Sequence, residues 1–468
     1  MGILDLMSIG ISAIRAQQAA MEVTAHNVAN INTQMYSKEE AQLVTKSPRN
    51  ESGVYLGTGV NISAVKRTED RFLNRSMFLG NMDNGYYSSK ASSLSEIEEV
   101  FNEATEDVGL DAAISDFWTA WSDLANNPEG SAERANLKGL TDTMTSRFHT
   151  TYKRLSLIQS NLNLEVKDSV TDINNLLTQI AEVNVQISNI ENTGADASDY
   201  RTTRNVLMGE LSQKIDFKYF ESDDGAVHIN AGNGRSLVEG SVAGRLEARA
   251  DPTNNNFYDV IFVSANGKEV NLTDEIEGGE LGGILEVRDV NIENAKDELN
   301  QIAYTIASEV NAQHELGTNL NGDTGVDFFT PLATVDRAAE LITLDPGIDA
   351  DLNEIAAGQS TSPGDNTNAN AIAEISNKAT MSGGTATIQE YLSTMVGNLG
   401  IDVQNATAQY EQSSAMVDQI ANYRDSVTGV SLEEELSNLM KYQQAFQAAA
   451  RILNSATDLV DILNQMQQ

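Results

Sequence analysis

The chain has 468 residues, with 30 Lys and Arg against 68 Asp and Glu, which gives a formal net charge of −38. So acidic a surface argues against nucleic acid and anionic membranes as partners, because both would repel it. Cysteine is absent, which excludes disulfides and thiolate chemistry, and no apolar run approaches the ~18 residues of a transmembrane helix.

Residues 1–35 carry apolar side chains at alternating spacings of three and four, which predicts a long amphipathic helix. Asp5 interrupts the early apolar residues and the first basic residue is Arg15, so we expect no cleaved secretory leader. The side chains that form this N-terminal seam are Leu4, Met7, Ile11, Ile14, Met21 and Val28.

The segment from 36 to 216 is assigned to the first part of a helical bundle domain. It opens with a turn and a strand that alternates at Val60 and Ile62. Ser93 followed by Glu96 is a capping box and predicts the start of a helix there. A wide apolar face containing both tryptophans follows, and we interpret it as core. Long and short helices are then expected over 137–190 and 200–215.

The pattern changes at residue 217, where short alternating runs are separated by Gly- and Asn-rich turns. Asn266-Gly267 is a hairpin signal. We therefore predict an inserted β-rich domain over 217–284. The helical period resumes over 285–429, the second part of the bundle domain, which includes a loop-rich stretch at 317–398.

Residues 430–468 form a second amphipathic helix in the prediction, with Ser431 and Glu434 as a capping box at its start. The matching periods of the two ends predict that 1–35 and 430–468 pack together as a coiled coil. The large side chains that form this C-terminal seam are Leu439, Tyr442, Phe446, Leu453, Val460 and Leu463, and the same repeat includes Ala449 and Ala456.

The two paired ends are expected to be marginally stable by themselves. Each buried seam side chain contributes ~1.5–3 kcal/mol, whereas each ordered backbone residue costs ~1–2 kcal/mol. We therefore expect the termini to be loose in the monomer and to become ordered when other subunits cover them. The alternative is an ordinary two-helix hairpin buried on the protein's own core.

Together these predictions give an α+β fold: a coiled coil of terminal helices, a long-helix bundle domain and an inserted small β-rich domain. A search for chemistry finds no catalytic constellation. The four histidines are widely separated, and His314 lacks the second histidine of a helical zinc motif. Residues 319–327 are rich in oxygen ligands, so weak calcium binding and a plain turn remain alternatives, with the turn favoured. We expect no enzyme activity, cofactor or metal.

Several motifs resemble the axial proteins of the bacterial flagellum, the family of rod, hook and hook-associated proteins. They include Ala29-Asn-Ile-Asn-Thr33, Gly57-Thr-Gly-Val60, Asp70-Arg-Phe-Leu73 and Tyr442-Gln-Gln-Ala-Phe446. The blocks at 109–128, 279–289, 310–314 and 363–366 are most similar to the hook-associated protein 1 family. Met35 departs from the pattern, since the family usually has Gly there; we expect the local turn to differ.

The resemblance implies a structural subunit that joins hook to filament and self-assembles through its terminal helices. It further implies a ring of about eleven copies, contacts with the hook protein and with a second junction protein or the flagellin side of the filament, and an export chaperone bound to the C-terminal helix. The subunit would leave the cell through the flagellar export apparatus and work outside it. The alternative from another class is a secreted adhesin or binding module displayed by the β-rich domain.

Overall fold

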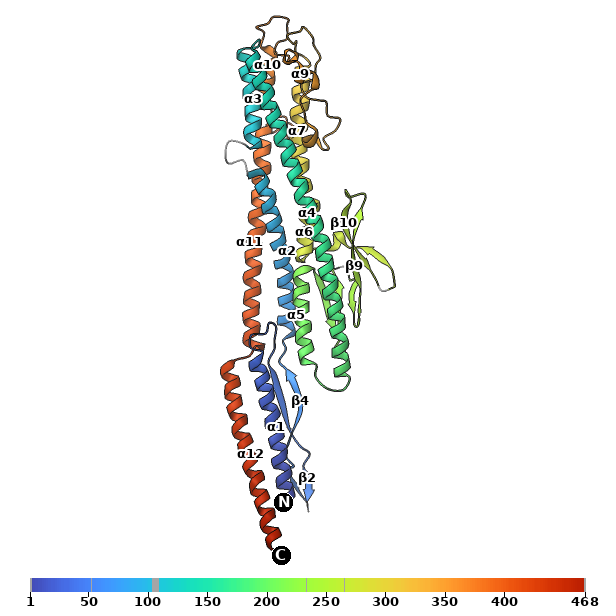
Figure 1. Cartoon of the computed structure of the whole chain (residues 1–468), viewed down its shortest axis with the longest axis vertical. Helices are drawn as coiled ribbons and strands as arrows, with labels where there is room; N and C mark the ends of the chain where they lie inside the picture. The colour runs from blue at the N-terminus through green and yellow to red at the C-terminus, as the bar shows by residue number, and fades with distance from the viewer. Residues whose placement is uncertain (1, 52, 103–108, 233, 265, 467–468) are drawn as a thin grey trace.

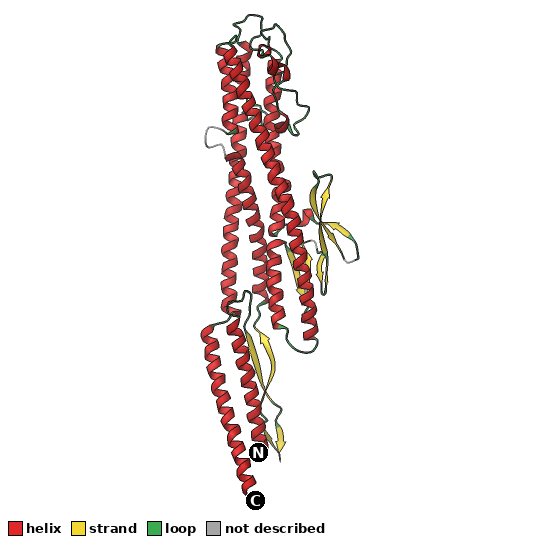
Figure 2. Ribbon diagram, in the orientation of Figure 1, coloured by secondary structure: helices red, strands yellow, loops and turns green. Residues whose placement is uncertain are grey.

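Helices set the shape of the molecule, an elongated rod with both chain ends at one tip (Figure 1). The computed structural model describes residues 2–51, 53–102, 109–232, 234–264 and 266–466. Strands occupy two regions at the side of the helices (Figure 2). The predicted α+β class is confirmed. No helix within the described ranges is both long and apolar enough to cross a membrane.

The terminal unit is built on two helices that lie side by side, α1 (Ile3–Ala29) and α12 (Leu432–Met466). Strand β1 (Glu39–Thr45) pairs with β4 (Val60–Arg67), and β2 (Arg49–Glu51) pairs with β3 (Val54–Leu56), both antiparallel. Strands β1 and β4 pack against α1. Residues 39–67, which the sequence analysis groups with the bundle, therefore lie beside the N-terminal helix.

The bundle consists of helices that lie along the long axis of the rod, above the terminal unit in the view of Figure 1. Its main members are α2 (Arg71–Asn102), α3 (Leu110–Asn126), α4 (Ser131–Glu191), α5 (Ser198–Lys214), α6 (Gly279–Glu286), α7 (Ile292–His314) and α11 (Ile388–Thr428). A π-helical turn, Val287–Asn291, links α6 to α7. The predicted helix over 137–190 is part of α4, whose inward side chains recur at helical spacing.

One predicted boundary inside the bundle is wrong. Ser93 does not begin a helix, because α2 is continuous from Arg71. The helix start lies at Asp70, whose carboxylate accepts hydrogen bonds from the backbone N–H groups of Phe72 and Leu73 at 2.9 and 3.0 Å. Packing of α2 along α11 holds the preceding turns in the helix, so the local signal at Ser93 is overridden.

Short helices and loops cap the far end of the rod: α8 (Ala338–Leu341), α9 (Pro346–Ala350) and α10 (Thr367–Ala373). Helix α11 begins at Ile388 after a capping box formed by Thr387 and Glu390. The last ten or so residues of the stretch expected to be loop-rich are thus helical.

The β-rich region contains two antiparallel sheets. The four-stranded sheet has the order β5 (Phe217–Glu221), β6 (Val227–Ala231), β7 (Ser236–Glu239) and β8 (Val242–Ala243). The three-stranded sheet has β10 (Phe257–Val263) between β9 (Arg245–Asp251) and β11 (Glu269–Asn271). Gly267 lies between β10 and β11 with φ +79°, which confirms the predicted hairpin. Both sheets contact α4.

Candidate assembly interface

Small residues occupy the buried apolar or glycine positions of both terminal helices. The buried apolar or glycine positions of α1 are Gly10, Ala16 and Ala20, and those of α12 are Ala449 and Ala456. A Cβ atom built on Gly10 would lie 3.5 Å from the Cβ atom of Leu453. The two backbones therefore approach closely, and the buried strip is too narrow to cover the large side chains on either flank.

The large predicted seam residues lie around this strip, and none of them is fully buried. Leu4, Ile11 and Leu463 are exposed, at 79%, 40% and 47%. The remaining predicted residues are half-buried: Met7, Ile14, Met21, Val28, Leu439, Tyr442, Phe446, Leu453 and Val460. The structure thus brings both predicted seams into one unit, yet leaves much of their apolar surface in solvent. A hairpin buried on the protein's own core does not fit this exposure.

A second apolar stripe on α12 was missed by the sequence analysis. We call it the outer stripe, and its members are each between 44% and 78% exposed: Leu432, Leu436, Met440, Ile452, Leu459, Ile462 and Met466. Most consecutive members are three, four or seven residues apart, with a gap of twelve between Met440 and Ile452. A helix that is apolar on two faces needs more than one partner helix.

The outer stripe is large enough to drive association. Full burial of one large apolar side chain contributes ~1.5–3 kcal/mol, and about half of each of these side chains is exposed. Covering the stripe would therefore yield on the order of 5 to 10 kcal/mol before the entropy cost of association. The outer stripe is therefore a candidate interaction site.

The terminal unit meets the bundle at a joint held by polar contacts. The backbone N–H of Lys38 donates to the carbonyl of Thr428 at 2.8 Å, and the Arg424 guanidinium donates to the carbonyl of Tyr36 at 3.2 Å. Burial lowers the pKa of Arg424. Because its guanidinium is nearly fully buried, Arg424 fixes the start of the terminal unit against the end of α11.

Met35 lies in this joint and adopts φ +59°. The turn therefore keeps the left-handed conformation that Gly would permit, contrary to the expectation that Met35 changes it. A non-glycine residue in that region costs on the order of 1–2 kcal/mol. The Met35 side chain is 6% exposed and belongs to the continuous hydrophobic core, so its burial offsets the strain.

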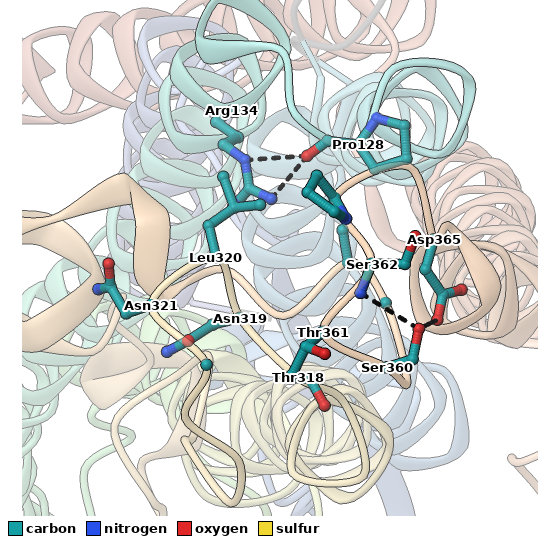
Figure 3. Close-up of a pocket in the computed structure, with 14 residues that line it drawn as sticks. Pro128, Arg134, Thr318, Asn319, Leu320, Asn321, Ser360, Thr361, Ser362 and Asp365 are labelled. Atoms are coloured by element: carbon teal, nitrogen blue, oxygen red, sulfur yellow. Dashed lines mark hydrogen bonds between the residues drawn. The ribbon is translucent and has the colours of Figure 1, made fainter.

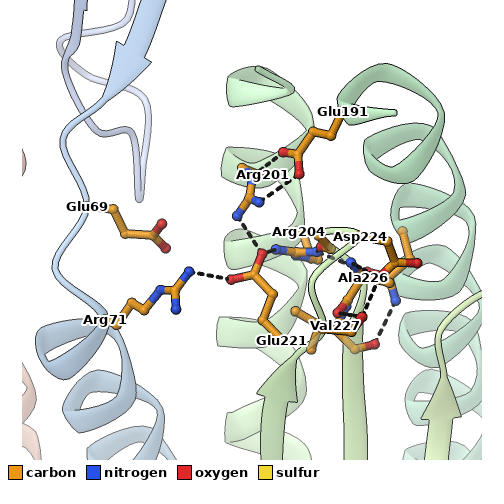
Figure 4. A network of polar contacts seen from close by, with 12 residues as sticks. Glu69, Arg71, Glu191, Arg201, Arg204, Glu221, Asp224, Ala226 and Val227 are labelled. Carbon is orange, nitrogen blue, oxygen red and sulfur yellow. Dashed lines mark hydrogen bonds and ion pairs between the residues drawn. The ribbon is translucent and has the colours of Figure 1, made fainter. Parts of the chain in front are cut away.

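An ion network next to the joint ties the bundle's lower end together (Figure 4). Glu221 accepts from Arg201 at 2.6 Å, from Arg204 at 3.1 Å and from Arg71 at 3.2 Å. Arg201 also binds Glu191 at 2.6 Å. Because Arg71 begins α2 and Glu221 ends β5, the network links the strand-to-helix connection of the terminal unit to the β-rich region.

At the opposite end, a pocket of about 270 Å³ lies among the distal loops (Figure 3). Buried Arg134 donates to the carbonyl oxygens of Pro128, Leu352 and Ile355, and burial lowers its pKa to about 10. The Asn319 and Asn321 amides donate to the Glu354 carboxylate at 2.6 and 2.9 Å. These bonds orient the start of the 319–327 loop against Glu354.

His314 is a structural histidine of the same distal end. Its Nδ1–H donates to the carbonyl of Val326 at 2.6 Å, and its Nε2 accepts from the backbone N–H of Ala356 at 2.8 Å. Burial lowers the pKa of His314 to about 4. Both ring nitrogens are occupied by backbone groups, so this histidine holds the loops in place rather than performing chemistry.

Comparison with known proteins places these features in a family. The model of the flagellar hook-associated protein FlgK helical domain matches residues 94–329, about half of the chain. The model of the flagellar basal body rod FlgEFG protein C-terminal region matches residues 424–466, and that of the flagella basal body rod protein matches residues 7–36. The last two matches fall on α12 and α1.

Relatives that match over nearly the whole chain have names from the same family as the matching family models. The chain is 28% identical to flagellar hook-associated protein 1 of Bacillus subtilis, over 97% of this chain and 96% of that protein. It is 26% identical to the protein of the same name from Escherichia coli, over 98% and 99%. The flagellar hook junction protein FlgK from Burkholderia pseudomallei shares the fold, with a TM-score of 0.68 at 16% identity over 76% of this chain and 100% of that one. Because the FlgK helical-domain model covers half of the sequence, the chain belongs to the flagellar hook-associated protein FlgK family.

Proposed function

We propose that this chain is a non-enzymatic structural subunit that joins the hook of the bacterial flagellum to its filament and self-assembles through α1 and α12. The observation that carries the proposal is the apolar surface that these two helices leave uncovered. Family membership supports the flagellar part of the proposal. Incomplete burial in a single chain supports the assembly part, because a pair of helices cannot cover both faces of each other.

The assembly surface would consist of the two predicted seams and the outer stripe. Small residues such as Gly10 and Ala449 would hold α1 and α12 together within one subunit. The exposed side chains, among them Leu4 and Leu459, would pack on α1 and α12 of neighbouring subunits. A closed ring, which we propose to contain about eleven copies, would bury this surface around its whole circumference.

Two faces of such a ring would meet different partners: the hook protein on one side and a second junction protein or the flagellin side of the filament on the other. We propose that the subunit reaches the outside of the cell through the flagellar export apparatus without a cleaved signal peptide. An export chaperone that covers α12 would keep its outer stripe from aggregating before assembly.

We further propose that the rod is divided as the sequence suggests, with the paired ends 1–35 and 430–468 on the inside of the assembly. The β-rich residues 217–284 would then project from the side of the bundle. The adhesin alternative would use the same projection, but it draws no support from the relatives, whose names refer to the flagellar hook.

Replacing Phe446 by Asp tests the proposal. The side chain is half-buried, so a charge there would be desolvated in the assembled subunit, and incorporation into flagella should be abolished while the bundle stays folded. Gln447→Asp, on the exposed neighbouring position, is the matched control and should assemble normally.

Leu459→Asp separates assembly from folding of the pair, because Leu459 belongs to the outer stripe. It should block incorporation without changing the helix content of the monomer. Filaments of normal number and length from cells carrying only Phe446→Asp or Leu459→Asp would refute the assembly role of these helices.

A further inference from the structure

Three chemistry-bearing side chains from separate elements meet at the joint. His26 lies in the last turn of α1, Glu39 begins β1, and Asp199 lies in the first turn of α5. One possible ligand atom from each lies within 4.8 Å of the other two. The nitrogen–oxygen distances are 3.5 Å from His26 Nδ1 to Glu39 and 3.8 Å from His26 Nε2 to Asp199. The cluster therefore bridges the terminal unit and the bundle.

Neighbouring hydrogen bonds fix the tautomer of His26. The Tyr36 hydroxyl donates to Asn27 Oδ1 at 2.9 Å, and the Asn27 amide is itself oriented by its donation to the Glu39 carbonyl. The Tyr36 oxygen also lies 3.3 Å from His26 Nδ1. Because its one proton is already donated to Asn27, the oxygen can only accept a hydrogen bond from Nδ1. Since the Glu39 carboxylate is the other neighbour of Nδ1, the ring proton resides on Nδ1.

The second ring nitrogen is then left with a lone pair that faces a carboxylate. Nε2 and Asp199 Oδ1 are 3.8 Å apart, and both are acceptors. Two ligands each about 2.1 Å from one metal ion lie at most about 4.2 Å apart, so an ion fits between these atoms.

The charge and the accessibility of the cluster suit a divalent ion. The two carboxylates carry two negative charges when the imidazole is neutral, which a divalent cation balances. The side chains of His26 and Asp199 are 40% and 73% exposed, whereas that of Glu39 is 10% exposed. All three line a cleft of about 680 Å³ between α1, the β1–β4 pair and the start of α5, through which an ion and its water ligands can enter.

We propose that His26 Nε2 and the Asp199 carboxylate, supported by Glu39, bind a divalent transition metal of the zinc class. One imidazole nitrogen with carboxylate oxygens is a donor set for zinc rather than for calcium or magnesium, which prefer oxygen alone. Glu39, whose carboxylate lies 3.5 Å from His26 Nδ1, supplies the second negative charge. Water completes the coordination.

Such an ion would act as a clip across the joint. It would fasten α1 and β1 of the terminal unit to α5 of the bundle, at the point where the chain between them turns through Met35 and Tyr36. The orientation of the terminal helices relative to the rod would then depend on metal. This role is independent of the assembly proposal, because it concerns contacts within one chain.

Calorimetric titration of the untagged full-length chain with Zn²⁺ tests the proposal. Millimolar Mg²⁺ in the buffer would occupy non-specific carboxylates on this acidic chain. We expect one binding site per chain, and we expect His26→Gln and Asp199→Asn each to weaken it at least tenfold. His228→Gln and Asp196→Asn are matched controls: the first removes another histidine outside the cluster, and the second removes a different carboxylate of the same cleft. Both should leave the affinity unchanged.

The visible absorption of bound Co²⁺ reports directly on the ligands of the metal, so it separates loss of a ligand from a general change in the structure of a variant. Its visible absorption should show a low-coordinate nitrogen–oxygen site in the wild type, and this band should be absent in His26→Gln. The proposal fails if Zn²⁺ does not bind in the presence of Mg²⁺, or if His26→Gln binds as tightly as the wild type. It also fails if Zn²⁺ at pH 7.5 leaves the stability of the joint unchanged.

Discussion

The two ends of the rod use the same helical periodicity in opposite ways. In the bundle, large side chains such as Phe117, Trp121 and Phe328 are fully buried. In the terminal unit, the fully buried apolar positions are small, as at Ala16, Ala449 and Ala456, and large side chains remain in solvent. An amphipathic repeat therefore specifies that a helix needs partners, and the number of neighbouring helices decides whether the chain itself provides them.

The difference has a simple geometric cause. Within the bundle, α4 contacts α3, α5, α6 and α7, so its apolar faces are covered by other parts of the same chain. In the terminal unit, α1 has α12 on one side and the β1–β4 pair on another. The bundle should fold by itself, whereas under the proposed function the terminal helices would complete their core in contact with another chain.

The largest expected effect tests the self-sufficient core. Trp121→Ala removes a fully buried aromatic that packs against Phe328 at a ring distance of 5.0 Å, and it should lower the free energy of unfolding by about 3–5 kcal/mol. Phe446→Ala, in the half-buried terminal seam, should cost about 1 kcal/mol in the monomer. Urea denaturation measures both. Equal losses would mean that the two regions are packed alike.

Met35 gives a smaller effect, at the boundary between the two regions. Met35→Ala removes buried surface while keeping a non-glycine residue at φ +59°, so it should lower the free energy of unfolding by about 2–3 kcal/mol. Met35→Gly should be about 1 kcal/mol less destabilising than Met35→Ala, because it relieves the backbone strain. If Met35→Ala instead has the higher free energy of unfolding of the two variants, the turn is not held in the left-handed conformation.

Acid should weaken the bundle through His314. Its pKa is about 4 in the folded chain, and an unfolded histidine has a pKa near 6.5. Between these values the unfolded chain binds a proton that the folded chain does not, so stability falls as the pH falls. The contribution is about 1.5 kcal/mol between pH 6.5 and pH 5. His314→Gln should remove this part of the pH slope in urea titrations, and an unchanged slope would exclude His314 as its source.

The smallest effect is expected in the outer stripe. Leu459→Ala should change the free energy of unfolding of the monomer by less than about 0.5 kcal/mol, because nearly half of the side chain is already in solvent. In the assembled state the same variant should cost several times more. Its dissociation temperature in purified flagella, compared with that of the exposed-site control Gln447→Ala, measures the difference. A large loss in the monomer would place Leu459 in an intramolecular core.

Local sequence patterns predicted the helices that have a regular apolar repeat and the hairpin that has a characteristic turn sequence. The long helix that contains 137–190, the hairpin at Gly267 and the terminal helices all follow from the spacing of apolar residues or from the conformational freedom of glycine. Ser93 was misread, because a capping pattern has no meaning inside a helix that packing on α11 already holds. The helical start of α11 was also placed late, since its signal lies among loops.

The sequence could not reveal which side chains share a site. His26, Glu39 and Asp199 are far apart in the chain, and only the docking of α5 beside α1 and β1 brings them together. Exposure was equally invisible, because the spacing of Leu436 or Ile462 looks the same whether a helix covers it or solvent does.

By itself, then, the sequence determined the helical periods, the position of the β-rich insertion and the motifs that place the chain in its family, since these depend on neighbours along the chain. The tertiary structure decided how closely α1 and α12 approach, which apolar faces stay uncovered and how Met35 is held in a conformation it does not favour. The physical reason is that burial and strain depend on contacts between distant segments, which no local pattern records.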